Sequence, residues 1–174
     1  MDDQRGVACT LLGMADDTQI AIVEMMTAGF KQIDSLARCV LPDIGIISGI
    51  EEAQLKRFAS VEKIAEAHCE LFENLKPSRG VAIIGSANET LVCRARQVFS
   101  GKLLVFEDDS VQVVASSSDG VSFKIAGLQQ EFLLRANGLP LLQEAWCAIM
   151  AAREVGLSDE AIAAGLCRFQ PVSV

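Results

Sequence analysis

The residue with the clearest chemical potential in this 174-residue sequence is the carboxylate Glu24. It lies near the end of the apolar run Gln19–Met25, which we expect to form a β-strand. In an open α/β sheet, the carboxyl end of a strand is the usual place for a ligand of a metal–phosphate complex. A structural alternative stays open, because a carboxylate at this place also caps neighbouring helices.

The sequence before this run lacks the other half of a phosphate site. A phosphate-binding loop is rich in glycine and carries a lysine. No glycine-rich, lysine-bearing segment occurs among the eighteen residues before the expected strand. The sequence therefore indicates the core of a nucleotide enzyme without the loop that binds the phosphates of the nucleotide.

Two further features could take part in chemistry. His68, the only histidine, lies on the apolar stripe of an expected helix, where it is either a core or cleft histidine or the remnant of a metal or pH-sensing site. The turn Gly85–Asn88 precedes another expected helix and could present backbone amides to an anion. The structural alternative is a strand-to-helix turn in which Asn88 or Ser86 caps the helix.

The composition predicts a folded acidic domain. Hydrophobic residues make up 51% of the chain, charged residues make up 22%, and the net charge is −8. We expect no nucleic-acid partner, because this charge repels phosphate backbones and no basic cluster offsets it. No apolar run is long enough to span a membrane, and the first residues lack a signal-peptide pattern. We therefore expect a cytoplasmic protein without a membrane partner.

The six cysteines are far apart and show no C-x-x-C spacing. With a single histidine in the chain, we expect no zinc site. We expect the cysteines to be reduced residues of the core.

The order of apolar runs predicts an α/β fold. Buried strands that alternate with helices are typical of a parallel sheet with helices on both faces. We expect one three-layer domain over residues 1–174, with an antiparallel hairpin at one edge of the sheet, because Val111–Ala115 and Val121–Ile125 flank a turn. The expected strands are 20–25, 44–48, 81–85 and 103–106, and the expected helices are 30–40, 60–75, 89–99, one that begins near Pro140 and ends at Gly156, and one that Ser158 caps.

Several stretches, in one order along the chain, resemble the central domain of the Mur ligases. The most similar subgroup is that of the UDP-N-acetylmuramoyl-tripeptide–D-alanyl-D-alanine ligases. The stretches that carry the resemblance are Gly6–Leu12, Ile22–Met25, Pro42–Leu75, Gly80–Ile84 and Leu157–Val172.

The resemblance implies an ATP-binding domain of an amide ligase that builds the peptidoglycan precursor. These ligases activate a carboxylate as an acyl phosphate, which an amine then attacks. Their central domain is normally flanked by a UDP-substrate domain and an amino-acid domain. We expect residues 1–174 to correspond to the central domain alone, beginning after the position of the family's phosphate loop.

The resemblance also assigns three positions to metal binding. Glu24 matches a metal-binding glutamate, Gln54 stands where the family has a metal-binding histidine, and His68 stands where it has a carbamylated lysine. An imidazole cannot be carbamylated in that way, and magnesium favours oxygen ligands over nitrogen. These three positions are therefore predicted to be vestiges of a metal site.

The positions that the resemblance assigns to the nucleotide have changed as well. Met26 replaces a glycine, and its bulk would crowd a phosphate. Asn88 ends the turn that matches an acidic nucleotide motif, and Gln143 lies in the segment Leu139–Gln143, where a His-Asn pair has become Leu-Pro. Asn88 and Gln143 are therefore predicted to be vestigial nucleotide-binding residues, and no residue is predicted to be catalytic.

Three functional hypotheses stay open. The first is a relative without ligase activity that serves as a binding or scaffold module, needs no cofactor, and self-associates or binds a protein partner. The second is a component of an ATP- and magnesium-dependent amide ligase that another chain completes. The third is an enzyme or small-ligand binder that reuses the crevice at the strand ends for a different substrate.

Overall fold

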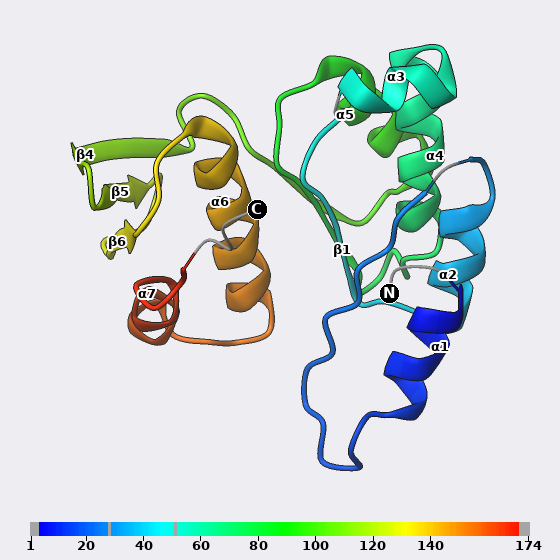
Figure 1. Cartoon of the computed structure of the whole chain (residues 1–174), viewed down its shortest axis with the longest axis horizontal. Helices are drawn as coiled ribbons and strands as arrows, with labels where there is room; N and C mark the ends of the chain where they lie inside the picture. Colours follow the sequence, from blue (N-terminus) through cyan, green and yellow to red (C-terminus); the bar gives the residue numbers. More distant parts are fainter. Residues whose placement is uncertain (1–3, 28, 51, 171–174) are drawn as a thin grey trace. The chain divides into compact units, whose positions relative to one another are not determined.

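The computed structural model of the chain describes residues 4–27, 29–50 and 52–170 (Figure 1). The described strands form two three-stranded sheets, and the protein is an α/β protein. The helices are α1 (Gln4–Leu12), α2 (Gln32–Val40), α3 (Glu52–Phe58), α4 (Val61–Glu73), α5 (Glu89–Val98), α6 (Leu139–Glu154) and α7 (Asp159–Leu166). The strands are β1 (Ile44–Ile47), β2 (Val81–Ile84), β3 (Lys102–Val105), β4 (Val111–Ser117), β5 (Gly120–Ile125) and β6 (Glu131–Leu134).

The first sheet has the strand order β1-β2-β3 and is parallel. The N–H of Val81 donates to the carbonyl of Asp43 at 3.0 Å, and four residues later the N–H of Gly85 donates to Ile47 at 2.9 Å. Hydrogen bonds that advance by the same number of residues, and in the same direction, along both strands are typical of a parallel pair. All of β2 is buried, as the continuous apolar run predicts. The predicted strands 44–48, 81–85 and 103–106 are confirmed to within one residue at each end.

The predicted strand over residues 20–25 is wrong. This segment forms no helix or strand and runs as an irregular trace between α1 and α2 (Figure 1). Its apolar side chains are not covered, since Ile20 is 52% exposed and Ile22 is 91% exposed. The apolar sequence favours extended backbone, but a strand also needs a neighbour to pair with. No described strand supplies one.

The chain divides into two compact units. The first consists of Met1–Gly45, Ile50–Ala82 and Asn88–Lys102, and the second consists of Ile46–Gly49, Ile83–Ala87 and Leu103–Val174.

Helix α4 is the centre of the first unit and packs with α2, α3 and α5. It begins at the predicted N-cap Ser60, whose hydroxyl accepts from the N–H of Lys63 at 3.4 Å. Ile64, Ala65 and Phe72 are fully buried on its predicted apolar stripe. Leu71 and Phe72 lie so close to Gly45 of β1 that a Cβ at Gly45 would approach Leu71 to 3.1 Å. The sequence therefore positions α4 through an apolar stripe and a glycine that lets the helix approach the strand.

The amino end of α2 is held by a buried carboxylate from α4. Glu70 is only 4% exposed, and its two oxygens accept from the N–H groups of Lys31 at 2.6 Å and Asp34 at 3.0 Å. Lys31 is the N-cap residue of α2 but provides no side-chain cap. Glu70 therefore satisfies two of the backbone donors that a helix leaves open at its first turn.

A second polar contact joins α2 and α4. The carboxylate of Asp34 accepts from the amide of Asn74 at 3.1 Å and from the guanidinium of Arg38 at 3.0 Å. These hydrogen bonds hold the pKa of Asp34 below its usual value, and the one from Asn74 has the larger effect. The amide of Asn74 also donates to the carbonyl of Glu70 at 2.9 Å, so one side chain connects both helices.

The predicted hairpin is confirmed in the second unit, but its predicted place is wrong. Strands β4 and β5 pair antiparallel, with a register shift between Val113 and Ala115. They do not extend the parallel sheet; they form a separate sheet with β6, in the order β4-β5-β6. The reason is the unpredicted β6, whose Phe132 pairs with Phe123 to form a stacked, fully buried ring contact.

Helices α6 and α7 complete the second unit. Pro140 occupies the first turn of α6, and Ser158 caps α7, as predicted. Trp146 on α6 is a core residue, 5% exposed, and meets the ring of Phe106 edge to face at 5.7 Å. Cys147 lies against Gly85, where a Cβ would come within 2.9 Å of its sulfur. Of the described helices, none is both long enough and apolar enough to cross a membrane.

The expectation that the cysteines belong to the core holds for only two of the six. Cys69 and Cys147 are buried, and burial raises the pKa of each thiol to about 12. Cys9, Cys39 and Cys93 are exposed, because they lie on the outer faces of α1, α2 and α5. An apolar neighbour in the sequence does not decide which face of a helix a cysteine occupies.

We predict that Glu70→Ala lowers the free energy of unfolding by about 2 kcal/mol, because two backbone donors lose a charged acceptor. Glu70→Gln should cost less, since its carbonyl oxygen can still accept one of the two bonds. Urea denaturation measures both effects. Glu66→Ala is the matched control, because Glu66 is exposed on the same helix. Equal effects at positions 66 and 70 would contradict the capping role.

We predict that Lys31→Gly raises the free energy of unfolding by up to about 1 kcal/mol, because Lys31 adopts a left-handed conformation with φ 66° that a side chain disfavours. The bond to Glu70 uses only the backbone N–H and is kept. Ser35→Gly, within α2, should instead lower stability by roughly 0.5–1 kcal/mol. Thermal unfolding checks the two signs, and a loss of stability in Lys31→Gly would refute the argument.

Candidate functional site

Gln54 and His68, two of the predicted metal positions, lie in contact. Gln54 is on α3 and His68 is on α4, and the two Nε2 atoms are 3.2 Å apart. The amide nitrogen donates and Nε2 of the ring accepts when the imidazole carries its proton on Nδ1. Both side chains are half-buried.

Glu24, the third predicted metal position, lies apart from this pair. It is exposed on the irregular segment before α2, and it has no hydrogen-bond or ion-pair partner among the described residues. Its carboxylate is available to a ligand from outside the chain. The structure thus brings two of the three predicted positions together and leaves the third without a contact to either.

These residues do not fit a bound magnesium ion. Magnesium favours oxygen ligands in an octahedral arrangement. The Gln54–His68 contact presents two nitrogen atoms that already bond to each other. In the described part of the chain, no three His, Cys, Asp or Glu side chains gather so that they could hold a metal ion. The arrangement of these residues therefore supports no chemical step that depends on bound magnesium.

Asn88, a predicted nucleotide-binding residue, caps α5. Its side-chain oxygen accepts from the N–H of Leu91 at 3.0 Å, which confirms that the turn Gly85–Asn88 ends in a helix cap. The capping oxygen is used within the protein. What Asn88 can still offer a ligand is its amide nitrogen.

The ends of β1 and β2 approach each other through small residues. A Cβ at Gly85 would lie 2.6 Å from the carbonyl oxygen of Ser48, so only glycine fits there. The hydroxyl of Ser86 is buried and has no hydrogen-bond partner among the described residues. In open α/β sheets, ligands usually bind outside the carboxyl ends of the strands, which is where Ser86 lies.

Gln143, the second predicted nucleotide-binding residue, lies in the first turns of α6 and is half-buried. It belongs to the second unit, whereas Glu24, Gln54, His68 and Asn88 belong to the first.

Sequence reasoning missed Glu70, which lies two residues beyond His68 on α4. An acidic residue on a helix is expected to face solvent, because acidic residues are almost never buried unless they are paired. Glu70 was therefore given no role. The predicted apolar stripe runs through His68, and a residue two positions further along lies on the opposite side of a helix, so the pattern places Glu70 outward. Its partners are backbone groups, which no sequence pattern marks.

The chain matches the model of a known family, the Mur ligase middle domain, over residues 1–150. A relative is the UDP-N-acetylmuramoyl-tripeptide–D-alanyl-D-alanine ligase of Bacillus subtilis (strain 168), which is 30% identical over 164 residues. That match covers 92% of this chain and 35% of the relative. The ligase of the same name from Synechocystis sp. is 30% identical and is matched over 36% of its length. The chain thus spans about a third of the length of these relatives.

Solved structures show the same fold. Crystal structure I of MurF from Acinetobacter baumannii superposes with a TM-score of 0.85 at 24% identity, over 98% of this chain and 39% of that one. MurF ligase from Thermotoga maritima, in complex with ADP, superposes with a TM-score of 0.77 at 18% identity, over 96% of this chain and 40% of that one. The family model, the collinear relatives and the shared fold agree: the chain belongs to the Mur ligase middle-domain family.

Proposed function

We propose that this Mur ligase middle domain has lost magnesium-dependent ATP chemistry and serves as a binding or scaffold module. The observation that carries the proposal is the hydrogen bond between Gln54 and His68, 3.2 Å long. It occupies the two positions that the family resemblance assigns to metal ligands.

The chemical argument concerns charge. Phosphoryl transfer depends on positioning and on neutralising the charge that spreads over the phosphate oxygens. A carbamylated lysine is an anionic oxygen ligand, whereas an imidazole has only nitrogen atoms to offer and carries no negative charge. Replacing that ligand at position 68 therefore removes both the oxygen donors and the negative charge that would hold a magnesium ion.

The nucleotide positions support the same proposal. The side-chain oxygen of Asn88 is engaged in capping α5. Met26, where the family has a glycine, is 59% exposed beside Glu24 and puts a bulky side chain where a phosphate would need close approach. Under this proposal, metal binding is weakened at Gln54 and His68, and nucleotide binding is weakened separately at Met26 and Asn88.

A second candidate is a component of a UDP-N-acetylmuramoyl-tripeptide–D-alanyl-D-alanine ligase, the activity in the names of the relatives. The observation that favours it is Glu24, which is retained and is exposed without a partner among the described residues. Under this candidate, a partner chain would supply the remaining metal and phosphate ligands.

We predict that isothermal titration calorimetry with ATP and magnesium detects no binding tighter than about 1 mM, because the residues that should hold the metal bond to each other. The matched variant is Glu24→Ala, which should leave this weak baseline unchanged. Tighter binding that Glu24→Ala abolishes would refute the proposal and favour the ligase component.

We also predict that removing metal ions leaves the protein's stability unchanged. A ligand that binds only the folded state raises the unfolding temperature, so a metal site would show itself in thermal unfolding. The midpoint should be the same in EDTA and in millimolar magnesium or manganese. Gln54→Leu should lower it under all of these conditions, by the equivalent of about 1 kcal/mol for one lost hydrogen bond. A metal-dependent increase that Gln54→Leu removes would contradict the prediction.

A further inference from the structure

Strand β4 (Val111–Ser117) lies at the edge of the antiparallel sheet, and one side of its backbone is unpaired. It pairs with β5 on one side, and no described strand lies on the other. Residues 112–117 are all exposed. An edge strand that nothing covers can pair with an extended segment of another chain.

The register of the hairpin identifies the free backbone groups. Ser110 precedes β4 and Ala126 follows β5, and the N–H of Ala126 donates to the carbonyl of Ser110 at 3.0 Å. In an antiparallel ladder, such hydrogen-bonded pairs alternate with pairs that do not bond to each other. Val111 and Val113 belong to pairs of the second kind, so their N–H and C=O groups point to the free edge. The edge thus offers donors and acceptors to a further strand.

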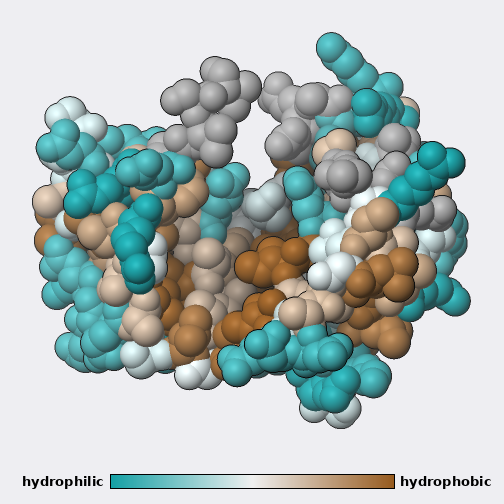
Figure 2. Space-filling view, turned by 60° about the horizontal axis from the view of Figure 1, so that its bottom comes forward, coloured by the Kyte–Doolittle hydropathy of each residue, from teal (hydrophilic) through white to brown (hydrophobic). Residues whose placement is uncertain are grey.

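The side chains of β4 carry no charge, and its valines are exposed. Val113 lies opposite the buried Phe123, so the two side chains are on the same face of the sheet, yet Val113 is 51% exposed. The strand contains no lysine, proline or acidic residue, which commonly protect an edge. The β4–β5 hairpin forms the left border of Figures 1 and 2, where hydrophilic side chains surround a smaller apolar area in Figure 2. A strand added beside Val111 and Val113 would extend the apolar face with its own alternate side chains.

A register shift limits the part of β4 that can pair regularly. The shift lies between Val113 and Ala115, and a bulge of this kind bends the strand. Beyond it, the carbonyl of Ser117 already accepts from the amide of Asn137 at 2.9 Å. The part with a regular free edge is therefore the first half, at Val111 and Val113.

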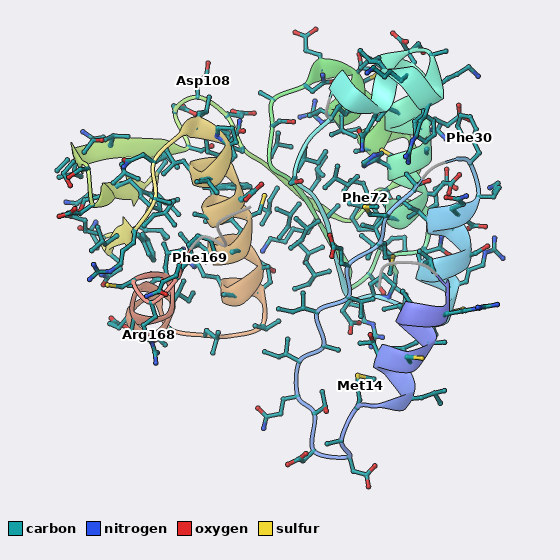
Figure 3. The ribbon with its side chains drawn as sticks, in the orientation of Figure 1. Met14, Phe30, Phe72, Asp108, Arg168 and Phe169 are labelled. Atoms are coloured by element: carbon teal, nitrogen blue, oxygen red, sulfur yellow. The ribbon has the colours of Figure 1, made fainter. Side chains whose placement is uncertain are left out.

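The charge next to this half of β4 is negative. Glu107, Asp108 and Asp109 precede the strand, all three are exposed, and none makes an ion pair with a described residue. Figure 3 shows the side chain of Asp108 pointing outward from the loop that leads to β4. Lys124 is the only basic residue in β4, β5 and β6, and it lies opposite Glu131. A segment that pairs with β4 therefore meets carboxylates at one end.

We propose that the free edge of β4 binds an extended segment of a basic protein partner. The backbone of this segment pairs with Val111 and Val113, its alternate apolar side chains lie beside theirs, and its lysine or arginine side chains meet Asp108 and Asp109. The net charge of −8 attracts a basic partner and repels a second copy of this chain. The proposal rests on the second unit alone, so it holds whether or not the domain has lost ATP chemistry.

The length of the free edge determines how strong the complex can be. Pairing at Val111 and Val113 covers less than the roughly 800 Å² per partner that a stable interface buries. Ion pairs at exposed carboxylates contribute little each and are screened by salt. We therefore expect a weak, transient and salt-sensitive complex.

Fluorescence anisotropy with the full chain tests the chemistry of the partner. The probe is a fluorescein-labelled peptide in which valine and threonine alternate between a pair of lysines at each end. It should bind with a dissociation constant below about 1 mM, and added salt should weaken it. A peptide with glutamates in place of the lysines, and one with two central prolines, should bind at least about tenfold more weakly, because the first reverses the charge and the second cannot pair as a strand.

Amide hydrogen exchange, measured by NMR, tests the place of binding. With the lysine-ended peptide at about ten times its dissociation constant, the amides of Val111 and Val113 should exchange about tenfold more slowly than in the free protein. Leu133 is the matched control, because its N–H points to the opposite edge of the same sheet, on β6. Its exchange rate should not change.

A charge reversal beside the edge tests the electrostatic contribution. Asp109→Lys should weaken binding of the lysine-ended peptide about fivefold, because an attraction becomes a repulsion. Glu144→Lys makes the same change of charge at an exposed position on α6 and should change the dissociation constant by less than about twofold. Circular dichroism checks that both variants are folded.

Several results would overturn the proposal. These are binding no tighter than about 1 mM, equal binding of the three peptides, and equal effects of Asp109→Lys and Glu144→Lys. Slower exchange at Leu133 without slower exchange at Val111 and Val113 would place the peptide elsewhere. If the amides of Val111 and Val113 become protected as the protein concentration rises without peptide, a second copy occupies the edge and the proposed partner is wrong.

Discussion

The buried carboxylate of Glu70 is the constraint on which the geometry of the first unit depends. It accepts from the backbone of Lys31 and Asp34, so it fixes where α2 begins and how that helix lies on α4. A buried charge is tolerated only when hydrogen bonds replace its hydration. The same bonds stabilise the left-handed conformation of Lys31, which strain would otherwise disfavour. One side chain on α4 thus sets the path of the chain where it leaves the segment that carries Glu24.

Helix α4 also carries the residue on which the proposed function depends. His68 lies two residues before Glu70, and it bonds to Gln54 on α3. The neighbouring helices α3 and α4 are thus joined by a side-chain hydrogen bond at the positions where the family resemblance places metal ligands. The fold does not depend on those positions, because its core is formed by Ile64, Phe72 and their apolar neighbours. Architecture and catalytic groups can therefore be separated in evolution.

Much of the local structure could be predicted from the sequence, because its causes are local. Ser60, Asn88 and Ser158 cap the helices that they were expected to cap, and the continuous apolar run at β2 is a buried strand. Three elements were missed: α1, α3 and β6. Each packs against another element, α1 against α2, α3 against α4 and β6 against β5, and such contacts leave no local sequence pattern. The strand expected at residues 20–25 failed for the complementary reason, since apolar sequence cannot supply a pairing partner.

The candidate site also has features that are local in the sequence and features that depend on contacts between distant residues. The family and the residue types at positions 24, 54, 68, 88 and 143 follow from the amino-acid sequence. How these residues are used depends on the folded chain, in which Gln54 and His68 bond to each other, Asn88 uses its oxygen as a cap, and Glu24 is exposed without a partner among the described residues. The physical reason is that residue chemistry is a local property, whereas a hydrogen bond between residues far apart in the sequence depends on how the helices pack.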